Sequence, residues 1–403
     1  MSKIAVIGAG ASGLMVAGLL SERHEVTLFD GNDKIGKKLF ITGKGRCNLT
    51  NLCPVDEFLK NVVHGDKFLK TALYNFDSYA CVDFFENLGL KTKVERGNRV
   101  FPESDKSSDV IKALQNHCKN VNIKLNNKIT AIAKKDEKFV VVSEQGKELF
   151  DKVVIATGGK SYKSTGSTGD GFKFAQKFGH TVEEIRPALC PILLKDKFVS
   201  KLQGVSLKNV QLNVVADGKK LSEFGEMLFT DKGITGPIVL SISSMINKAQ
   251  TIELSLDFKP ALTEQQLDAR ILRDFEQNKN KDLKFVLKGL LPRAVAEIFA
   301  GVISVDDCKK VHDVTKEERL KIVQSLKRFR LSFNGLYELD TGIVTSGGVS
   351  TKEINPKTFE SKIVPGLYFL GEVLDVDALT GGFNLQIAWA TAFSCAKNLK
   401  GED

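Results

Sequence analysis

The first thirty residues order a strand, a glycine-rich turn, a helix, a second strand and an acid. Lys3 to Ile7 form the expected strand, Gly8-Ala9-Gly10-Ala11-Ser12-Gly13 the turn, and a helix follows to about Glu22. A second strand, Glu25 to Phe29, ends at Asp30. This order is the fingerprint of a β-α-β unit that holds the adenosine diphosphate half of FAD or NAD. We therefore expect an α/β protein with a nucleotide-binding domain.

Each glycine of the turn has its own expected role. Gly8 permits the tight turn out of the strand, Gly10 lets the backbone approach a pyrophosphate, and Gly13 lets the helix pack closely on the sheet. The anion would then lie at the positive end of the helix dipole. Asp30 stands where a carboxylate accepts both hydroxyls of an adenosine ribose and repels a 2′-phosphate.

Composition excludes several classes of protein. The 403 residues are 42% hydrophobic and 27% charged, which is typical of a soluble globular protein of two or three domains. No run of about 18 apolar residues appears, and the first strand begins at Lys3, so we expect no membrane span, no signal peptide and a cytoplasmic location. Seven cysteines and five histidines show no metal-ligand spacing, so we expect reduced thiols and no metal site.

The net charge of +9 allows two interpretations. A solvated basic surface that draws in anionic substrates or cofactors is the simpler one, and the sequence favours it. Nucleic-acid binding requires a clustered basic patch with interleaved aromatics, and only Lys327-Arg328-Phe329-Arg330 resembles such a patch.

Several segments after Asp30 can be assigned from their patterns. Residues 36 to 51 are rich in glycine and base, which suits a loop laid along a dinucleotide, and residues 66 to 90 have a helical pattern. Residues 122 to 150 alternate as in a three-stranded meander. The β-branched run from Lys152 to Ile155 predicts a strand buried on both faces in a parallel sheet. The turn over 164 to 171 opens a helix over 172 to 178 and is a second expected ligand cradle.

The character of the sequence changes around Pro187 and Pro191. Residues 192 to 258 are β-rich, and residues 262 to 330 are helical, with capping boxes at Thr263 and Thr315. The last sixty residues return to strand, glycine and helix. We therefore expect the FAD-binding domain at 1–190 and 345–403, interrupted by a substrate or cap domain at 191–344 that is β-rich over 191–260 and helical over 261–330.

Three features favour FAD over NAD. Val154 to Gly159 resembles a second flavin-domain signature, and Pro365 to Glu372 resembles the C-terminal flavin motif whose acid holds the ribityl chain. The Gly381-Gly382 turn would aim a helix N-terminus at the flavin pyrimidine ring, where Asn384, Leu385 and Gln386 would supply donors.

Taken together, these segments resemble the HI0933-like (YhiN/BaiN) family of NAD(P)/FAD-dependent oxidoreductases. The matching segments are Gly36 to Asn51, Arg99 to Ser104, Ala156 to Gly171, Leu228 to Thr230, Gly236-Pro237, Thr345 to Ser350 and Gly371 to Gln386. The resemblance implies a Rossmann-type FAD-binding domain with an inserted domain containing a small β-barrel and helices. Two positions depart from the pattern: Asp231 stands where family members commonly have His, and Glu372 where many flavin enzymes use Asp.

We therefore expect an FAD-dependent oxidoreductase. Hydride would pass between flavin N5 and a small-molecule substrate held between the two domains. A more distant similarity of residues 165 to 171 and 347 to 349 to fumarate reductase flavoproteins favours chemistry at an activated C=C bond. No second GxGxxG turn is present, so any NAD(P)H would bind only transiently. The alternatives are a flavoprotein acting on nucleic acid, of the tRNA-modification type, and a non-catalytic flavin redox sensor.

The expected cofactor contacts come from six parts of the chain. They are Gly8, Gly10, Ala11, Ser12, Gly13, Asp30, Lys38, Thr42, Gly45, Arg46, Cys47, Asn48, Ala156, Thr157, Gly158, Gly159, Gly371, Glu372, Gly382, Asn384, Leu385 and Gln386. Arg46, Lys44 and Arg99 are candidates for neutralising an anionic substrate or lining its cavity. Equally, Arg46, Cys47 and Asn48 can simply hold their loop against FAD, and a nucleophilic role for Cys47 is disfavoured because no CxxC pair exists.

Overall fold

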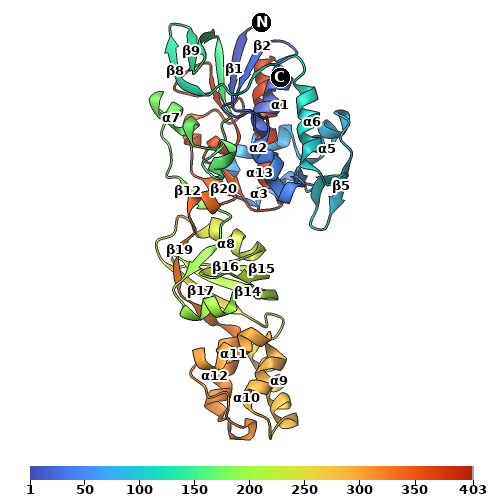
Figure 1. Ribbon diagram of the computed structural model, residues 1–403, viewed down its shortest axis with the longest axis vertical. Coiled ribbons are helices and arrows are strands. Elements are labelled where there is room, and N and C mark those ends of the chain that lie inside the picture. Colours follow the sequence, from blue (N-terminus) through green and yellow to red (C-terminus); the bar gives the residue numbers. More distant parts are fainter. Residues whose placement is uncertain (402–403) are drawn as a thin grey trace. The chain divides into compact units, whose positions relative to one another are not determined.

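The computed structural model describes residues 1–401 and divides into two compact units, drawn together in Figure 1. The first unit combines Met1–Ala188 with the segment that begins at Glu338, and the second is Leu189–Tyr337. The second unit is thus inserted into the first. Among residues 1–401, no helix has both the length and the apolar character that crossing a bilayer requires.

The first unit is built on a five-stranded parallel sheet with the order β21-β11-β1-β2-β7. The strands are β1 (Lys3–Ile7), β2 (Glu25–Phe29), β7 (Asn122–Lys124), β11 (Lys152–Ile155) and β21 (Leu367–Phe369). Val6 is opposite both Leu28 and Val154, and all three are fully buried. Such continuous apolar runs are stable only when helices or loops cover both faces of the sheet. The predicted α/β fold with a parallel sheet is confirmed.

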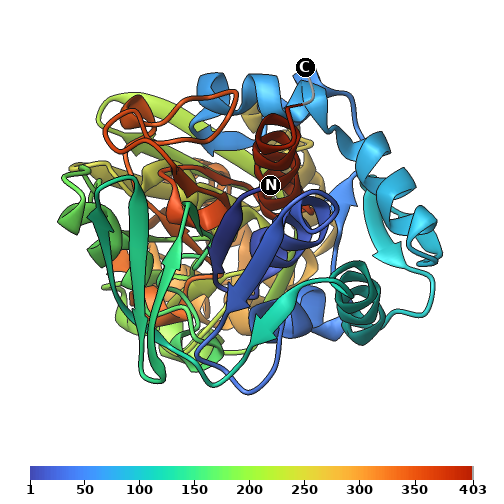
Figure 2. The same ribbon diagram turned by 90° about the horizontal axis from the view of Figure 1, so that it is seen from above.

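Helices pack around this sheet. α1 (Ala11–Leu20) and α13 (Phe383–Leu399) lie side by side although they come from opposite ends of the chain (Figure 2). α6 (Ser107–His117) packs against α1 and against α2 (Lys37–Ile41), and α7 (Asp170–Lys177) follows the second predicted cradle. A short helix α3 (Val55–Leu59) precedes α4 (Asp66–Asn75) and α5 (Ser78–Asn87).

The structure differs from the sequence prediction in two of these elements. The helical pattern over 66–90 is broken between α4 and α5, because the Asp77 side chain caps a new helix by accepting a hydrogen bond from the Ala80 N–H at 2.8 Å. The meander consists of β8 (Ile129–Lys135), β9 (Lys138–Ser143) and β10 (Gly146–Phe150), whereas β7 pairs with β2 in the parallel sheet. Because the β7–β2 pairing joins residues that are distant in the sequence, no local sequence pattern predicts it.

Three small antiparallel sheets complete the first unit. They are β3 (Thr50–Asn51) with β6 (Arg99–Pro102) and β5 (Thr92–Glu95), β4 (Val62–His64) with β22 (Asp377–Ala378), and β12 (Arg186–Ala188) with β20 (Val344–Ser346). Apart from the local β5–β6 hairpin, each pairing fixes a segment of the N-terminal half against another segment distant in sequence.

The second unit holds a seven-stranded antiparallel sheet with the order β18-β17-β14-β15-β16-β13-β19. Its strands are β13 (Ile192–Leu194), β14 (Ser206–Ala216), β15 (Lys219–Phe229), β16 (Gly233–Thr235), β17 (Ile252–Asp257), β18 (Phe329–Leu331) and β19 (Phe333–Leu336). The two edge strands, β18 and β19, are joined by Ser332 alone. The sheet therefore curls until its edges meet, as a small barrel does.

Helices fill the rest of the second unit. They are α8 (Pro237–Ile246), α9 (Glu264–Gln277), α10 (Leu283–Leu290), α11 (Arg293–Val302) and α12 (Lys316–Lys327). The predicted capping boxes at Thr263 and Thr315 both form and begin α9 and α12. Phe299 stacks on Phe329 with ring centroids 5.7 Å apart, inside an apolar core separate from that of the first unit.

Candidate functional site

The turn between β1 and α1 places its three glycines in three different environments. A Cβ added at Gly8, where φ is +105°, would lie 2.5 Å from the Ala156 carbonyl oxygen, and one at Gly13 would collide with the Gly8 carbonyl. A Cβ at Gly10 would meet no atom within 4 Å. Gly10 is also the N-cap of α1, and no side chain caps it. The helix thus presents free N–H groups to open space, as an anion site requires.

Asp30 is fixed beside this turn. Its Oδ2 accepts a hydrogen bond from the Ala9 N–H at 2.7 Å, and its Oδ1 accepts one from the Asn32 N–H at 2.8 Å. Two carboxylate oxygens offer about four acceptor positions. The carboxylate therefore keeps capacity for a diol while its orientation is held by the backbone.

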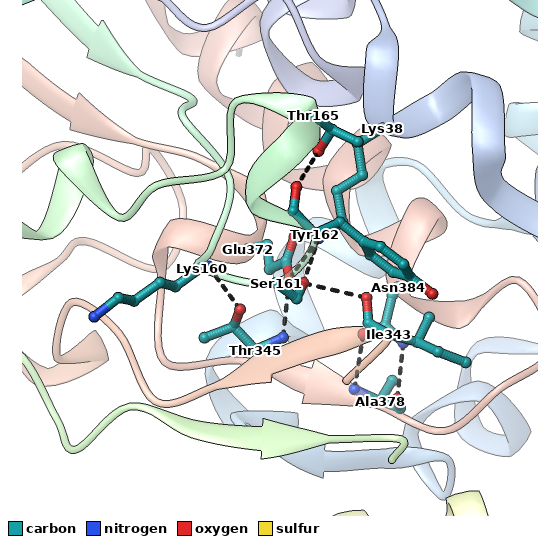
Figure 3. Close-up of polar contacts among 10 residues, drawn as sticks. All are labelled: Lys38, Lys160, Ser161, Tyr162, Thr165, Ile343, Thr345, Glu372, Ala378 and Asn384. Carbon is teal, nitrogen blue, oxygen red and sulfur yellow. Dashed lines mark hydrogen bonds and ion pairs between the residues drawn. The ribbon is translucent and has the colours of Figure 1, made fainter. Parts of the chain in front are cut away.

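Lys38 and Glu372 form the polar centre of the site, although they are far apart in the sequence (Figure 3). The Lys38 ammonium donates to Glu372 Oε2 at 2.8 Å and to Ser161 Oγ at 2.8 Å. Glu372 Oε1 accepts from the Thr345 N–H at 2.9 Å, and Thr345 Oγ1 accepts from the Lys160 N–H at 2.8 Å. Three separate segments thus converge on the carboxylate of a fourth.

These contacts keep Glu372 ionised. Burial is the largest single influence and by itself raises its pKa, but the charge of Lys38 and hydrogen bonds from Lys38, Thr345 and Gly159 more than offset it. The net effect lowers the pKa of Glu372 below its ordinary value. Lys38 and Glu372 therefore form an ion pair at neutral pH.

The segment after β11 packs directly against both features. A Cβ at Gly159 would lie 2.6 Å from the Thr345 Cβ, so only glycine permits this approach. Gly158 has φ +70° and lies near Ser167 and Glu372. The Thr157 hydroxyl oxygen is buried and has no hydrogen-bond partner among residues 1–401. Gly371, with φ +67°, packs against the Ser12 side chain. The residues predicted from β1, β11 and β21 are thus brought together at one place.

The N-terminus of α13 is held by its own side chains. Gly382, with φ +101°, caps the helix, and a Cβ there would lie 2.5 Å from the Thr50 carbonyl oxygen. Asn384 Oδ1 accepts from the Ala378 N–H at 3.0 Å, and its Nδ2 donates to the Ala378 carbonyl at 2.8 Å. Leu385 packs against the apolar core.

Gln386 differs from the expectation that it supplies a donor to the flavin. It is fully buried, its Nε2 donates to the Phe76 carbonyl at 2.7 Å, and its backbone N–H donates to the Gly382 carbonyl at 3.1 Å. Together with Asn384, it is engaged inside the protein. The free donors at this helix end are therefore backbone N–H groups of the first turn.

The predicted loop over 36–51 contains more regular structure than expected. It forms α2 followed by a tight turn over Thr42–Gly45, in which Gly43 and Lys44 have φ of +57° and +58°, and Thr42 Oγ1 donates to the Leu39 carbonyl at 2.7 Å. Gly45 has φ +84°, and a Cβ there would meet no atom within 4 Å. Asn48 Oδ1 is buried without a hydrogen-bond partner among residues 1–401.

Arg46 is occupied by carboxylates of its own unit. Its Nε donates to Asp105 Oδ1 at 2.8 Å, its Nη1 donates to Glu95 Oε2 at 3.3 Å, and its Nη2 contacts both acids. The guanidinium also stacks over Phe101 at 4.1 Å. These hydrogen bonds raise the pKa of Arg46, with the bond to Glu95 the largest cause. This geometry favours the interpretation in which Arg46 holds the loop.

The other two cationic candidates differ from Arg46. Lys44 is exposed, and its side chain has no partner among residues 1–401. Arg99 is exposed and donates from Nε to the Arg96 carbonyl at 3.1 Å. Neither side chain contacts the polar centre formed by Lys38 and Glu372.

Cys47 is fully buried, and burial raises the pKa of its thiol to about 12, although a hydrogen bond with Thr42 acts in the opposite direction. Because the thiolate is the nucleophilic form, this cysteine is unreactive at neutral pH.

Ser161 and Lys160 belong to the polar centre but were not predicted. Ser161 is fully buried and contacts Lys38, and the Lys160 N–H contacts Thr345, 185 residues away. Their sequence context, a serine and a lysine after a glycine pair, carries no signal for these contacts.

The residues present fit FAD. Open space lies in front of Gly10 and Gly45, α1 is uncapped, and Asn48 Oδ1 and Thr157 Oγ1 are buried without partners among residues 1–401. Buried polar atoms without hydrogen bonds are rare in proteins, so two of them on the segments that follow the predicted ligand turns favour a polar partner that the protein itself does not supply. A bound dinucleotide would supply polar groups of this kind.

Comparison with known proteins agrees with this description. The family described as "HI0933-like protein Rossmann domain" matches residues 2–398. The chain is 30% identical over 405 residues to the 3-dehydro-bile acid delta(4,6)-reductase of Clostridium scindens, covering 98% of each chain. It is 32% identical over 404 residues to the ribosomal RNA dihydrouridine synthase of Haemophilus influenzae, covering 98% of this chain and 97% of that one.

A solved structure shares the fold at much lower identity. The open conformation of a flavocytochrome c3 fumarate reductase aligns with a TM-score of 0.53 at 16% identity and covers 100% of this chain and 78% of that one. The family match spans nearly the whole chain, and it includes the glycine turn, Asp30 and the polar centre at Glu372. The chain therefore belongs to the HI0933-like family and is an FAD-dependent oxidoreductase with a Rossmann-type domain.

Proposed function

We propose that the protein reduces the C5=C6 double bond of a uridine in ribosomal RNA, giving dihydrouridine. The observation that carries this proposal is the 32% identity, over nearly the whole of both chains, to a protein named ribosomal RNA dihydrouridine synthase. The bile-acid relative is named as a reductase as well. An enone and the uracil ring share the same reactive group, a C=C bond conjugated to a carbonyl.

Bound FAD supplies a two-electron carrier that delivers hydride to the electron-poor carbon of such a bond. The chain's own residues position it and stabilise charge. The free N–H groups at the start of α13 favour negative charge nearby, and the α1 N-terminus at Gly10 favours a pyrophosphate. Asp30 is oriented to accept ribose hydroxyls. The Lys38–Glu372 ion pair joins α2 to the segment after β21, and Lys38 also donates to Ser161 in the segment after β11.

The net charge of +9 supports an RNA substrate over a neutral one, because phosphate contacts dominate affinity for nucleic acid. A second candidate is a small cyclic enone, which the similarity to the bile-acid reductase favours. NAD(P)H is proposed as a transient electron donor. A redox sensor without turnover is the remaining alternative.

One experiment separates these functions. The FAD-loaded protein is reduced anaerobically with NADPH or NADH, then mixed with unmodified ribosomal RNA transcript, free uridine or a steroid dienone, while flavin absorbance is followed. We expect reoxidation by the RNA and a gain of two hydrogens at one uridine, detected by mass spectrometry of nuclease digests. Reoxidation by the dienone alone would favour the second candidate. If none of these substrates reoxidises the flavin, both candidate functions are contradicted.

A further inference from the structure

One end of the sheet in the second unit gathers lysines on adjacent segments. Lys195 follows β13, Lys197 and Lys201 lie on the 3-10 helix η3 (Lys197–Leu202), and Lys232 lies in the turn between β15 and β16. We call these four residues the lysine end. All four side chains are exposed, and none has an ion-pair or hydrogen-bond partner among residues 1–401.

Backbone hydrogen bonds hold the lysine end together. The Leu194 N–H donates to the Lys232 carbonyl at 3.0 Å, just before η3, and the Gly204 N–H donates to the Phe229 carbonyl at 2.9 Å, just after it. Both ends of η3 are therefore tied to the β15–β16 turn. Val199 and Leu202 are buried beneath η3, so Lys197 and Lys201 project from an anchored base.

Two acids lie in the same segments as these four lysines. Asp196 is engaged by Ser332, whose N–H donates to Oδ2 at 2.6 Å and whose hydroxyl donates to Oδ1 at 2.9 Å. Asp231 is exposed beside Lys232 and is the other acid in these segments. Neutral donors leave the charge of Asp196 in place, but four lysines against two acids still give the lysine end a positive formal charge.

The helical part of the same unit is different, because its basic side chains are largely paired. Arg319 contacts Asp268 at 2.7 Å, and Lys309 contacts Glu318 at 2.9 Å. In the patch singled out from the sequence, Lys327 contacts Asp257 at 2.6 Å and Arg328 contacts Glu264. Two of the three basic residues of that patch are therefore held in ion pairs, and Arg330 alone is exposed without one among residues 1–401. The lysine end differs in that all four of its neighbouring lysines are exposed and unpaired among residues 1–401.

We propose that the lysine end binds the phosphate backbone of RNA. The proposal rests on the proposed function for the identity of the polyanion and adds the surface that holds it. Exposed, unpaired ammonium groups on a fixed base can neutralise phosphates at little desolvation cost, and each contact releases bound counterions. Such contacts position an RNA without reading its sequence.

The test compares two double variants of the FAD-loaded protein. K197Q/K201Q removes two charges from the lysine end. K219Q/K220Q removes two charges from exposed lysines of the β14–β15 hairpin and is the matched control. Affinity for ribosomal RNA transcript is measured across a salt series. For single-stranded contacts, K197Q/K201Q should weaken binding roughly 25-fold at about 0.1 M salt and reduce the salt slope by about 1.4, whereas the control should stay close to wild type.

Each outcome decides the proposal. Equal losses in the two variants would overturn it, since diffuse net charge would then explain binding, and so would an unchanged slope in K197Q/K201Q. If K197Q/K201Q keeps its affinity for RNA but loses affinity for phosphatidylserine vesicles, the proposal is also overturned, because the lysine end would then bind membranes. Unchanged flavin absorbance and thermal unfolding in both variants show that the fold is intact.

The RNA-binding result can be distinguished from the result of the test for the proposed reaction. If RNA binds with the predicted dependence on Lys197 and Lys201 but no dihydrouridine forms, the proposed RNA-binding surface is supported and the proposed reaction is contradicted. If dihydrouridine forms and K197Q/K201Q binds and reduces the RNA as the wild type does, the proposed reaction is supported and the proposed RNA-binding surface is contradicted.

Discussion

The Lys38 ammonium lies 2.8 Å from Glu372 Oε2, although 334 residues separate the two in the sequence. Glu372 also accepts the Thr345 N–H, and Lys38 also donates to Ser161. About a fifth of each charged side chain is exposed, 22% for Lys38 and 21% for Glu372. The pair is therefore partly desolvated, and it joins the two parts of the chain that form the first unit.

Removing one partner should destabilise the first unit. In E372Q the Lys38 ammonium keeps its place but loses its counter-ion, and we expect a loss of about 2 kcal/mol in the free energy of unfolding. The matched control is D340N, which breaks the exposed Lys163–Asp340 pair of the same 2.8 Å length and should cost less than about 1 kcal/mol. Denaturant unfolding of both variants, followed by circular dichroism, measures the difference. Equal effects would contradict a special role for Lys38 and Glu372.

The same pair predicts a pH dependence. Because folding lowers the pKa of Glu372, the ionised form stabilises the fold at neutral pH. This contribution is complete above the unfolded value of about 4.3 and is lost as pH falls from there through the folded pKa. The stability difference between wild type and E372Q should thus be constant from about pH 7 to pH 5 and shrink below about pH 4. A difference that grows on acidification would show the opposite sign.

The sequence was most informative where local chemistry dictates the structure. The strand, glycine turn and helix at Gly8 to Gly13, and the capping boxes at Thr263 and Thr315, can be read from residues a few positions apart. Ser161 and the β7–β2 pairing could not be predicted, because their partners are distant in sequence and their side chains carry no periodic signal. Gln386 was assigned a ligand role because position alone cannot show that its amide binds the Phe76 carbonyl.

Gly10 is expected to control cofactor loading without affecting the fold. A Cβ there meets no atom within 4 Å, so G10V can fold, but its branched side chain would enter the space proposed for the pyrophosphate. The purified variant should be colourless, with unfolding close to that of the apo wild type. G289V is the control, since Gly289 is exposed within α10, has no positive φ and also has open space around it. A yellow G10V protein with full flavin occupancy would contradict the assignment of the turn.

Arg46 should affect flavin retention more than the chemical step. Because its donors bind Glu95 and Asp105, R46A would free the loop that follows α2. We expect weaker FAD binding in R46A, but a near-normal turnover number once excess FAD is added. R46K should restore little, because one ammonium cannot reproduce the forked contacts to two acids. A turnover number that stays low with FAD saturating would instead place Arg46 at the substrate.

Cys47 should be chemically silent in the folded protein. Its thiol is fully buried with a pKa of about 12, whereas Cys308 is exposed on the second unit. Brief treatment with iodoacetamide at about pH 8 should alkylate Cys308 and leave Cys47 unmodified, since only the thiolate reacts at a useful rate. Peptide mass spectrometry before and after denaturation measures both sites, and denaturation should expose Cys47. Activity of C47S close to wild type is also expected, because the hydroxyl fits the space of the thiol. Rapid native alkylation of Cys47 with loss of activity would mean that this cysteine reaches the reactive site after all.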